Sequence, residues 1–406
     1  MVVARDLLTE SGSIFVQIGV DNVDLVKGLL REVFGSDNHV ATIVYAKSTS
    51  TTGEHLPSAY DSLVWFAKER ESLRYRQLYR DKSINGEAPA AYSRIQLPTG
   101  QRMTAAEFAQ LGEIRPAGSR LFRIDNLTSQ RIGRAAGEGS AMHFPLSFRG
   151  RTFKPPGSRG WTTTRVGMER LERSDRMIST GDTVSYVRFL DDFSTTTIND
   201  VWLDTVIAGF ASDKVYVVQT GTKVVERCML MTTDPGDLVL DPTCGSGTTA
   251  FVAEQWGRRW ITTDTSRVAL ALARTRLMAG RFPAYLLRDS REGAAKEGEI
   301  TGRPPEEGPF RNDIRQGLVL ERVPHVTLKS IANNAEIDVI HANWAPKIEA
   351  ALAALNTALD TKHAEWQVPR TLPEDAKPAV QEAHTAFWAA RRARQAEMDA
   401  SIARNA

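Results

Sequence analysis

The alternation of apolar and polar residues is clearest between positions 238 and 264. Residues 238–240 form a short apolar run that is typical of a buried parallel strand, and residues 260–263 predict a second strand. Between them, residues 248–255 carry apolar side chains at helical spacing. The order strand, glycine bend, helix, strand and closing acid (Asp264) predicts a cradle for a nucleoside cofactor, because a carboxylate there can hold both ribose hydroxyls.

The same kind of pattern predicts a second α/β segment near the start of the chain and two helices near its end. Residues 5–10 and 21–34 predict helices, and residues 14–18, 40–45 and 63–67 predict strands. We expect residues 343–365 and 373 onward to form an αα-hairpin, either a structural appendage or an oligomer contact. The polar residues 48–53 predict a loop, either a lid ordered by DNA or a surface connection.

These elements predict five segments and one central sheet, to which both α/β halves contribute. Residues 292–315 are charged and rich in Gly and Pro, and therefore predict a linker or an exposed loop. We expect an α/β half over residues 1–80, an irregular insert over 81–200 and a cofactor-binding α/β half over 201–291. A linker with a post-domain segment should follow over 292–342, and a helical appendage over 343–406.

The glycine bend favours one cofactor over others. Gly245 and Gly247 allow a tight turn and close backbone approach, but the third position of a dinucleotide fingerprint is Ala250 and no P-loop lysine follows. A cofactor with a ribose and an amino acid but no phosphates, S-adenosylmethionine, suits this string better. The alternative is a glycine-rich turn in an α/β domain without a ligand.

At these residues the chain resembles a known family. Residues 240–278 resemble the cofactor half of bacterial DNA amino-methyltransferases, in particular the modification subunits of type III restriction systems, which methylate adenine at N6. Residues 4–19, 30–38, 214–227 and 321–334 extend the similarity. The resemblance implies a Rossmann-like α/β methyltransferase sheet in permuted motif order, with an irregular basic insert and a C-terminal helical appendage.

The resemblance also implies roles for individual residues. Asp241 would fix loop amides or the cofactor's amino group, Asp264 would take the ribose hydroxyls, and the helix start would face the cofactor carboxylate. Trp202 and Asp204 match a Trp-x-Asp string near the family's pocket, although Trp202 is equally suited to packing. The expected cofactor contacts are Asp241, Pro242, Thr243, Cys244, Gly245, Ser246, Gly247, Thr248, Thr249, Asp264, Gln219 and Lys223.

One departure from the family concerns catalysis. Its catalytic signature is an Asp, Asn or Ser followed by Pro-Pro and an aromatic residue, placed upstream of the helix that includes Arg5. The Pro-Pro pairs here follow Lys154 and Arg303 and lack both the acid and the aromatic. We therefore assign no catalytic residue, and we expect a chain that is incomplete at its N-terminus and methylates poorly by itself. The alternative is a non-catalytic recognition and cofactor-binding remnant or subunit that needs a separate catalytic piece.

Composition narrows the class of protein. With 42% hydrophobic and 25% charged residues among 406, the chain is typical of a soluble globular protein, and no run of 18 apolar residues predicts a membrane span. The only cysteines are Cys228 and Cys244, which suggests a reducing, cytoplasmic location. Neither they nor the scattered histidines have the spacing of a metal site.

A net charge of +2 conceals a basic region in the insert. Residues 120–165 hold nine basic and two acidic side chains, which gives a net charge of +7, interleaved with five aromatic residues. This pattern favours contact with DNA phosphates and stacking near an extruded base, whereas the alternative is a solvated loop packed by its own aromatics. The expected DNA contacts are Arg131, Arg134, Arg149, Arg151, Lys154, Arg159 and Arg165.

The sequence therefore predicts a DNA amino-methyltransferase of a restriction–modification system, with adenine N6 favoured over cytosine N4. The implied partners are double-stranded DNA, a second copy of the chain and a restriction subunit. A methyltransferase acting on RNA or a small molecule is the other alternative, and the basic insert disfavours a small molecule. No nuclease or helicase motif is found.

Overall fold

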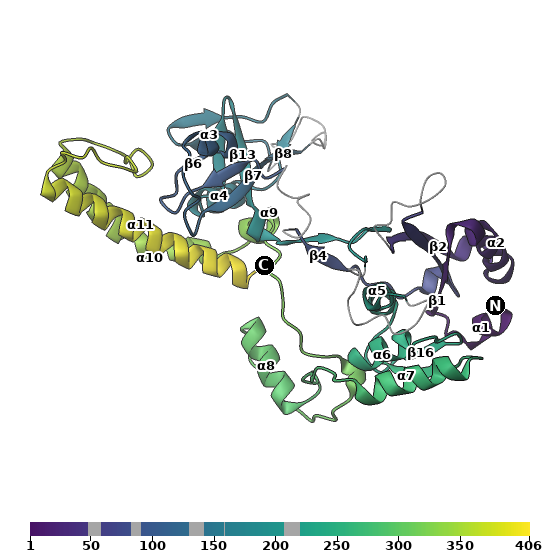
Figure 1. Ribbon diagram of the computed structural model, residues 1–406. Helices are drawn as coiled ribbons and strands as arrows, with labels where there is room; N and C mark the ends of the chain where they lie inside the picture. The colour runs from purple at the N-terminus through teal and green to yellow at the C-terminus, as the bar shows by residue number, and fades with distance from the viewer. Residues whose placement is uncertain (48–57, 83–90, 130–141, 158, 207–219) are drawn as a thin grey trace. The chain divides into compact units, whose positions relative to one another are not determined.

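The computed structural model describes residues 1–47, 58–82, 91–129, 142–157, 159–206 and 220–406. They fall into two compact units (Figure 1). Unit 1 comprises Met1–Arg80 and Thr196–Glu321, and unit 2 comprises Asp81–Thr195 and Arg322–Ala406. The C-terminal helices therefore belong to the same unit as the insert.

Unit 1 contains the elements predicted on both sides of the insert. In chain order they are α1 (Val2–Leu7), β1 (Ser13–Ile18), α2 (Val23–Phe34), β2 (His39–Ala46), β3 (Tyr60–Ala67), β15 (Val201–Trp202), α5 (Thr222–Thr232), β16 (Leu238–Asp241), α6 (Thr248–Gln255), β17 (Arg259–Thr262), α7 (Arg267–Ala279) and α8 (Arg291–Thr301). Short strands β4 (Tyr79–Asp81) and β14 (Thr195–Thr197) pair with each other.

A four-stranded sheet in the order β1-β3-β2-β15 forms the first half of unit 1. β3 pairs antiparallel with both neighbours, and β15 joins β2 in parallel. Val64 and Phe66 on β3 pack on one face with α2, whereas Leu63 and Trp65 pack on the other with α5. Both faces are covered, so β3 is apolar almost throughout instead of alternating.

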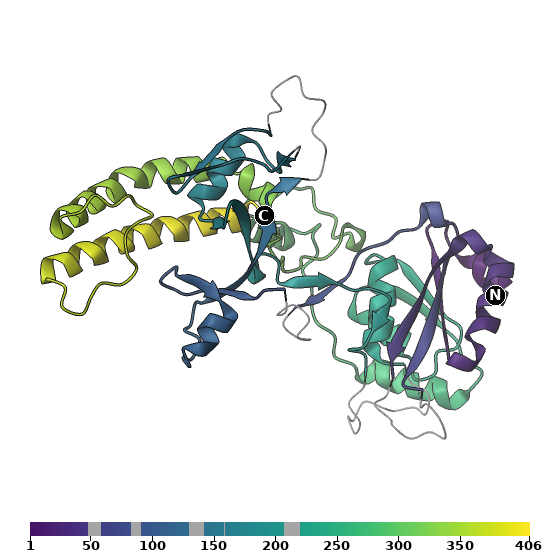
Figure 2. The ribbon, with the colours of Figure 1, turned by 90° about the horizontal axis from the view of Figure 1, so that it is seen from above.

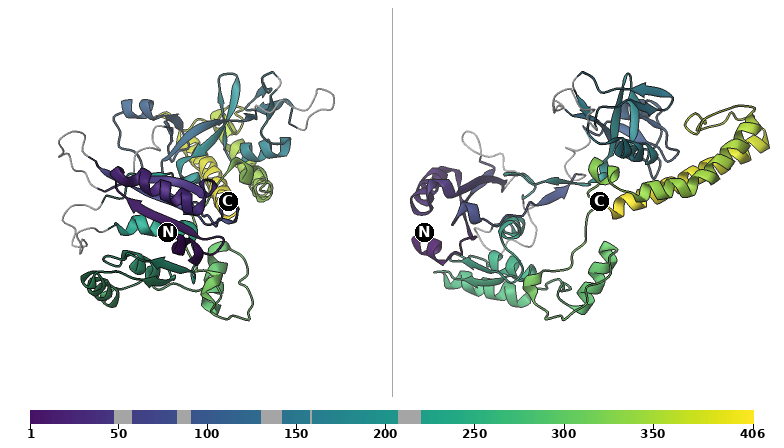
Figure 3. Two further views of the ribbon diagram at one scale, coloured as in Figure 1. Left: turned by 90° about the vertical axis from the view of Figure 1, so that its right-hand side faces the viewer. Right: turned by 180° about the vertical axis from the view of Figure 1, so that it is seen from behind.

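β16 and β17 form a separate parallel pair, so the described strands do not make the single sheet that we expected (Figure 3). α5 links the two sheets, because Cys228 packs on the first and Met229 packs with Val252 of α6. The opposite face of the pair leaves Leu238, Leu240 and Ile261 between 43% and 52% exposed. Parallel strands are normally buried on both faces, so this face is atypical.

The linker prediction for residues 292–315 was partly wrong, because α8 occupies its start. The Ser290 hydroxyl accepts a hydrogen bond from the amide of Gly293 at 3.0 Å and caps the helix, and Glu292 lies in its first turn. A cap and a first-turn acid both favour a helix start. Gly302, in the left-handed region with φ of +65°, ends it.

The described part of unit 2 is built from short strands, three short helices and a long helical pair. Its elements are β5 (Arg94–Gln96), β6 (Arg102–Thr104), α3 (Ala105–Gln110), β7 (Arg120–Asn126), β8 (Thr128–Ser129), β9 (Leu146–Phe148), β10 (Arg151–Phe153), β11 (Gly160–Trp161), α4 (Arg165–Arg173), β12 (Met177–Thr180), β13 (Thr183–Phe189), α9 (Leu328–Ala332), α10 (Glu336–Leu359) and α11 (Pro378–Arg404). Five strands form an antiparallel sheet in the order β12-β13-β7-β5-β6.

The predicted helical hairpin is confirmed as α10 and α11, which lie side by side (Figures 1 and 2). It is part of the core of unit 2. Ile337 and Met398, from these two helices, are fully buried in one cluster with Trp161 and Leu171 of the insert. Each such buried side chain stabilises the fold by about 1.5–3 kcal/mol.

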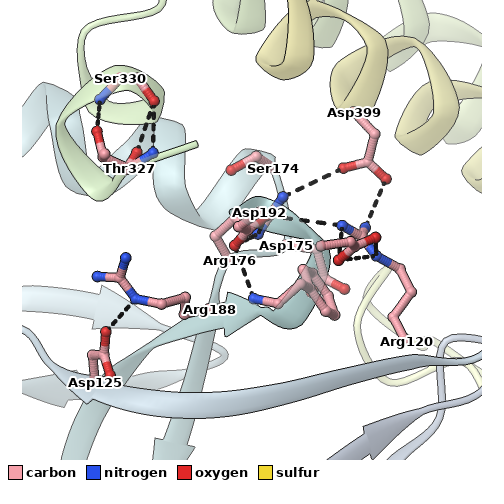
Figure 4. A network of polar contacts seen from close by, with 12 residues as sticks. Arg120, Asp125, Ser174, Asp175, Arg176, Arg188, Asp192, Thr327, Ser330 and Asp399 are labelled. Atoms are coloured by element: carbon pink, nitrogen blue, oxygen red, sulfur yellow. Dashed lines mark hydrogen bonds and ion pairs between the residues drawn. The ribbon is translucent and has the colours of Figure 1, made fainter. Parts of the chain in front are cut away.

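A buried ion network attaches α11 to the sheet of unit 2 (Figure 4). Arg176 donates from Nη1 to both oxygens of Asp192, at 2.8 and 2.6 Å, and both side chains are almost fully buried. Asp192 also accepts from the amide of Phe189 at 2.8 Å. Asp399 of α11 lies 4.0 Å from Arg176 and 3.4 Å from Arg120. The helix end is therefore held by charge as well as by apolar packing.

Replacing Asp192 with Asn should destabilise unit 2 by about 3–5 kcal/mol, because Arg176 would lose its hydrogen-bonded counter-charge and keep only Asp399, 4.0 Å away. Urea unfolding monitored by tryptophan fluorescence measures this change. Asp182→Asn is the matched control, since Asp182 is fully exposed and pairs with the exposed Arg151. Equal midpoints for the two variants would contradict the assigned role of the network.

Candidate functional site

The predicted glycine bend connects β16 to α6. Gly245 and Gly247 have φ values of +49° and +74°, in the left-handed region that favours glycine. A Cβ on Gly247 would lie 2.8 Å from the Cβ of Ala273 on α7. Gly247 is therefore required both by the turn and by the close approach of a second helix.

The acid at the end of β17 lies against this bend. One carboxylate oxygen of Asp264 accepts from the amide of Gly245 at 2.9 Å, and the other accepts from the amide of Ser266 at 2.8 Å. These two amides, Ser266 first, hold the pKa of Asp264 below its usual value. The carboxylate is therefore ionised at neutral pH and keeps lone pairs for a vicinal diol. The bend and the acid fit the ribose of a nucleoside cofactor.

Asp241 forms hydrogen bonds with residues on both sides of the glycine bend. It accepts from the Thr249 hydroxyl at 2.6 Å and from the amide of Thr243 at 3.0 Å. Cys244 is buried, with its amide bonded to the carbonyl of Thr263 at 3.0 Å, so its side chain fills the turn. Pro242 is exposed beside it. These contacts preorganise the cradle before any ligand binds.

Arg276 is a site residue that the motif did not indicate. From α7 it donates to the hydroxyl of Thr248 at 2.9 Å, and Ser246 lies 3.4 Å from the same nitrogen. Ser246 and Thr248 are buried, so their hydroxyls face the guanidinium. The only signal in the sequence is spacing, because Arg276 and Ala273 lie three residues apart on the helix face that contacts the bend.

Lys223, one of the expected cofactor contacts, belongs to an ion-paired group with Asp204 and Arg227. Asp204 accepts both guanidinium nitrogens of Arg227, at 2.9 and 2.7 Å, and lies 2.8 Å from the Lys223 ammonium. Desolvation raises the pKa of Asp204, but the hydrogen bonds and charges of Arg227 and Lys223 outweigh it, so the pKa is well below its usual value. Trp202 is buried beneath Arg227 and donates to the carbonyl of Asn199. Gln219 lies outside the described residues.

The aromatic residues of the insert are mostly core, which contradicts the stacking role that we expected for them. Phe122 is fully buried, and four others belong to the main core of unit 2: Phe144, Phe148, Phe153 and Trp161. They are buried because the C-terminal helices cover them, and those helices are remote in sequence. A buried ring has no exposed face for a base.

The basic residues of the insert divide into paired and unpaired groups. Arg149 lies 3.4 Å from Asp175, and Arg151 lies 3.1 Å from Asp182. Three others are exposed and have no ion pair within the described part of the chain: Lys154, Arg159 and Arg165. Arg165 also covers the Phe144 ring, 4.6 Å from its centroid. Arg131, Arg134 and the polar stretch 48–53 lie outside the described residues.

Two further features bear on the class of site. Among the described residues, no three His, Cys, Asp or Glu side chains gather in a way that could hold a metal ion. No helix in the described ranges is long and apolar enough to cross a membrane.

Comparison with known proteins gives relatives of one kind. The type II methyltransferase M.EcaI of Enterobacter cloacae is 25% identical over 291 residues, which are 70% of this chain and 57% of M.EcaI. The type III EcoP15I Mod subunit of Escherichia coli is 27% identical over 73 residues, 18% of this chain and 11% of that protein. The chain thus spans little more than half of M.EcaI.

Among solved structures, the M1.HpyAVI–SAM complex matches 68% of this chain and 79% of its own, with 11% identity and a TM-score of 0.32. At the level of families, residues 2–275 match the N6 and N4 methyltransferase family described as DNA methylase. That match takes in more than half of the 406 residues and includes the glycine bend, Asp264 and Arg5, so this chain is a member of the DNA methylase family.

Proposed function

We propose that the chain is the modification component of a restriction–modification system, which methylates the exocyclic amino group of an extruded base in duplex DNA. S-adenosylmethionine is the methyl donor of this family. The observation that carries the proposal is the contact between the Asp264 carboxylate and the Gly245 amide, which puts a diol acceptor beside the bend. Adenine N6 is favoured over cytosine N4 by the resemblance to type III modification subunits.

The cofactor supplies an electrophilic methyl group on a sulfonium when it is bound. Asp264 would hold its ribose, and the bend from Pro242 to Gly247 would lie along the rest of the cofactor. Arg276 would hold α7 against the start of α6, so that the bend does not reorganise on binding. Asp264 and the bend would thereby hold the cofactor in one orientation, in which its methyl group would be available to the amino nitrogen of the base.

Contact with the DNA backbone would come from the insert. Lys154, Arg159 and Arg165 are exposed and unpaired within the described residues, so they can neutralise phosphates without breaking an ion pair. Arg131 and Arg134 remain part of the proposal by position in the sequence. A second copy of the chain and a restriction subunit are the proposed protein partners, in the cytoplasm.

A second candidate function is a cofactor- and DNA-binding subunit that works with a separate catalytic segment. The exposed Leu238, Leu240 and Ile261 favour it, because a parallel pair with an open apolar face is a natural place for a further strand or helix. β1 forms one edge of its sheet and is only partly buried along its length. An acid-Pro-Pro-aromatic segment seated here would supply the base clamp that residues 1–406 lack.

Asp264→Ala should weaken S-adenosylmethionine binding by about 100-fold or more, because two charge-assisted hydrogen bonds to the ribose are lost. Isothermal titration calorimetry measures the affinity. Thr265→Ala is the matched control, since it changes the adjacent exposed residue and keeps the carboxylate. An unchanged affinity in Asp264→Ala would contradict the cofactor assignment.

The chain alone should transfer little tritiated methyl from S-adenosylmethionine to duplex DNA, because residues 1–406 contain no acid-Pro-Pro-aromatic motif that would clamp the extruded base. The same chain extended upstream to include an acid-Pro-Pro-aromatic motif should be active, or the two pieces should be active when mixed. An extension with the acid changed to Ala is the control. Strong incorporation by the 406-residue chain alone would overturn this proposal.

A further inference from the structure

Three segments that are far apart in the sequence meet on one face of unit 2. They are the turn of the β5–β6 hairpin at Thr99, the turn of the β9–β10 hairpin at Arg149, and the loop between α10 and α11. Arg370 of that loop donates to the carbonyl of Thr99 at 2.6 Å, and a Cβ on Gly150 would lie 3.3 Å from the Trp366 ring. The loop is therefore packed against both turns.

Several arginine side chains cluster where these segments meet. Arg102 and Arg149 share one carboxylate, Asp175, at 3.0 and 3.4 Å. Arg391 and Arg394 share another, Glu365. Arg370 has no carboxylate within ion-pair distance in the described residues, since its partners are the Thr99 carbonyl and the Trp388 ring, 4.1 Å from the guanidinium carbon. Four guanidinium groups therefore share two carboxylates, and the fifth, Arg370, has none within ion-pair distance in the described residues. Glu172 is a further acid nearby, and burial raises its pKa.

The electrostatics of Arg370 follow from this crowding. Desolvation first, and then the charges of Arg391, Arg102 and Arg149, lower its pKa to about 10, against the attraction of Asp175. The group stays protonated at neutral pH, but its charge lacks a full counter-charge. An anion placed beside it would relieve the repulsion between the guanidinium groups.

Part of this surface is exposed to solvent, whereas Arg370 is half-buried. The Arg149 side chain is 39% exposed and Trp366 is 47% exposed, next to each other across Gly150. Arg149 has a φ of +48°, in the left-handed region, which a non-glycine residue rarely adopts. Cationic side chains with an exposed aromatic ring are typical of surfaces that contact nucleic-acid backbone.

We propose that Arg370 and Trp366, in the loop between α10 and α11, form with Arg149 of the insert a surface that binds phosphodiester groups of duplex DNA. The C-terminal helical hairpin is then part of the DNA-contact surface as well as of the core. This inference rests on the proposed action on duplex DNA. Arg370 and Arg149 hold phosphate oxygens, and Trp366 covers the adjoining sugar.

The test is the salt dependence of duplex binding, because each phosphate contact contributes about 0.9 to the slope of log K against log salt. Arg370→Gln and Arg149→Gln should each reduce the magnitude of the slope by about 1, equally for cognate and random duplexes. Arg370→Lys and Arg149→Lys should keep the slope, because the charge remains. Arg392→Gln, on an exposed residue of α11, is the matched control and should leave the slope unchanged.

Two outcomes separate this inference from the proposed function. If the wild-type chain binds duplex with a clear salt slope and both Gln variants keep that slope, the inference is overturned while the proposed function stands. If the wild-type chain does not bind duplex DNA, both are overturned.

A second measurement does not depend on the Gln variants folding. Phenylglyoxal modification of the wild-type chain, read by mass spectrometry, should show Arg149 protected by duplex DNA and Arg392 unprotected. Equal modification of Arg149 with and without duplex overturns the inference.

Discussion

The site in unit 1 depends on the parallel pairing of β16 with β17. This pairing puts Asp241 opposite Thr262, so the ends of both strands, and the acids that follow or close them, reach the same edge. Asp241 then ties the bend together, while Asp264 faces the Gly245 amide. Backbone amides satisfy part of each carboxylate, and for Asp264 they also lower the pKa. The shape of the bend is therefore held by contacts within the chain.

α5 connects this cradle to the rest of unit 1. Its opposite sides carry Cys228 toward the four-stranded sheet and Met229 toward α6, and Arg227 is held by Asp204 from the loop after β15. The same helix therefore packs against both the first sheet and the helix that follows the bend. The open face of β16 and β17 lies on the side that α5 does not cover, which is why an apolar surface and an incomplete sheet occur together.

In unit 2, ion pairs as well as apolar packing hold together segments that are distant in the sequence. Asp399 near the C-terminus meets Arg176 and Arg120 of the insert, and Asp338 of α10 meets Arg170 and Arg173 of α4. Arg120 and Arg176 therefore have structural partners, whereas Lys154, Arg159 and Arg165 are exposed without an ion pair in the described residues. The loop between α10 and α11 carries further cations, among them Arg370.

The sequence by itself determined the strands and helices around the glycine bend, the helical hairpin, and the pairing of Asp264 with the bend. Local periodicity, glycine positions and a strand-ending acid are short-range signals, and they also carry the resemblance to DNA methylases. Only the tertiary structure decided that the aromatics of the insert are core and that Ser246 and Thr248 face Arg276. It also decided that β16 and β17 pair apart from the four-stranded sheet, and that the loop with Arg370 packs on the turns of the insert. Those outcomes depend on contacts between residues from about 30 to more than 200 positions apart. No local pattern specifies such contacts, because they form only when separate elements compete to bury the same surface.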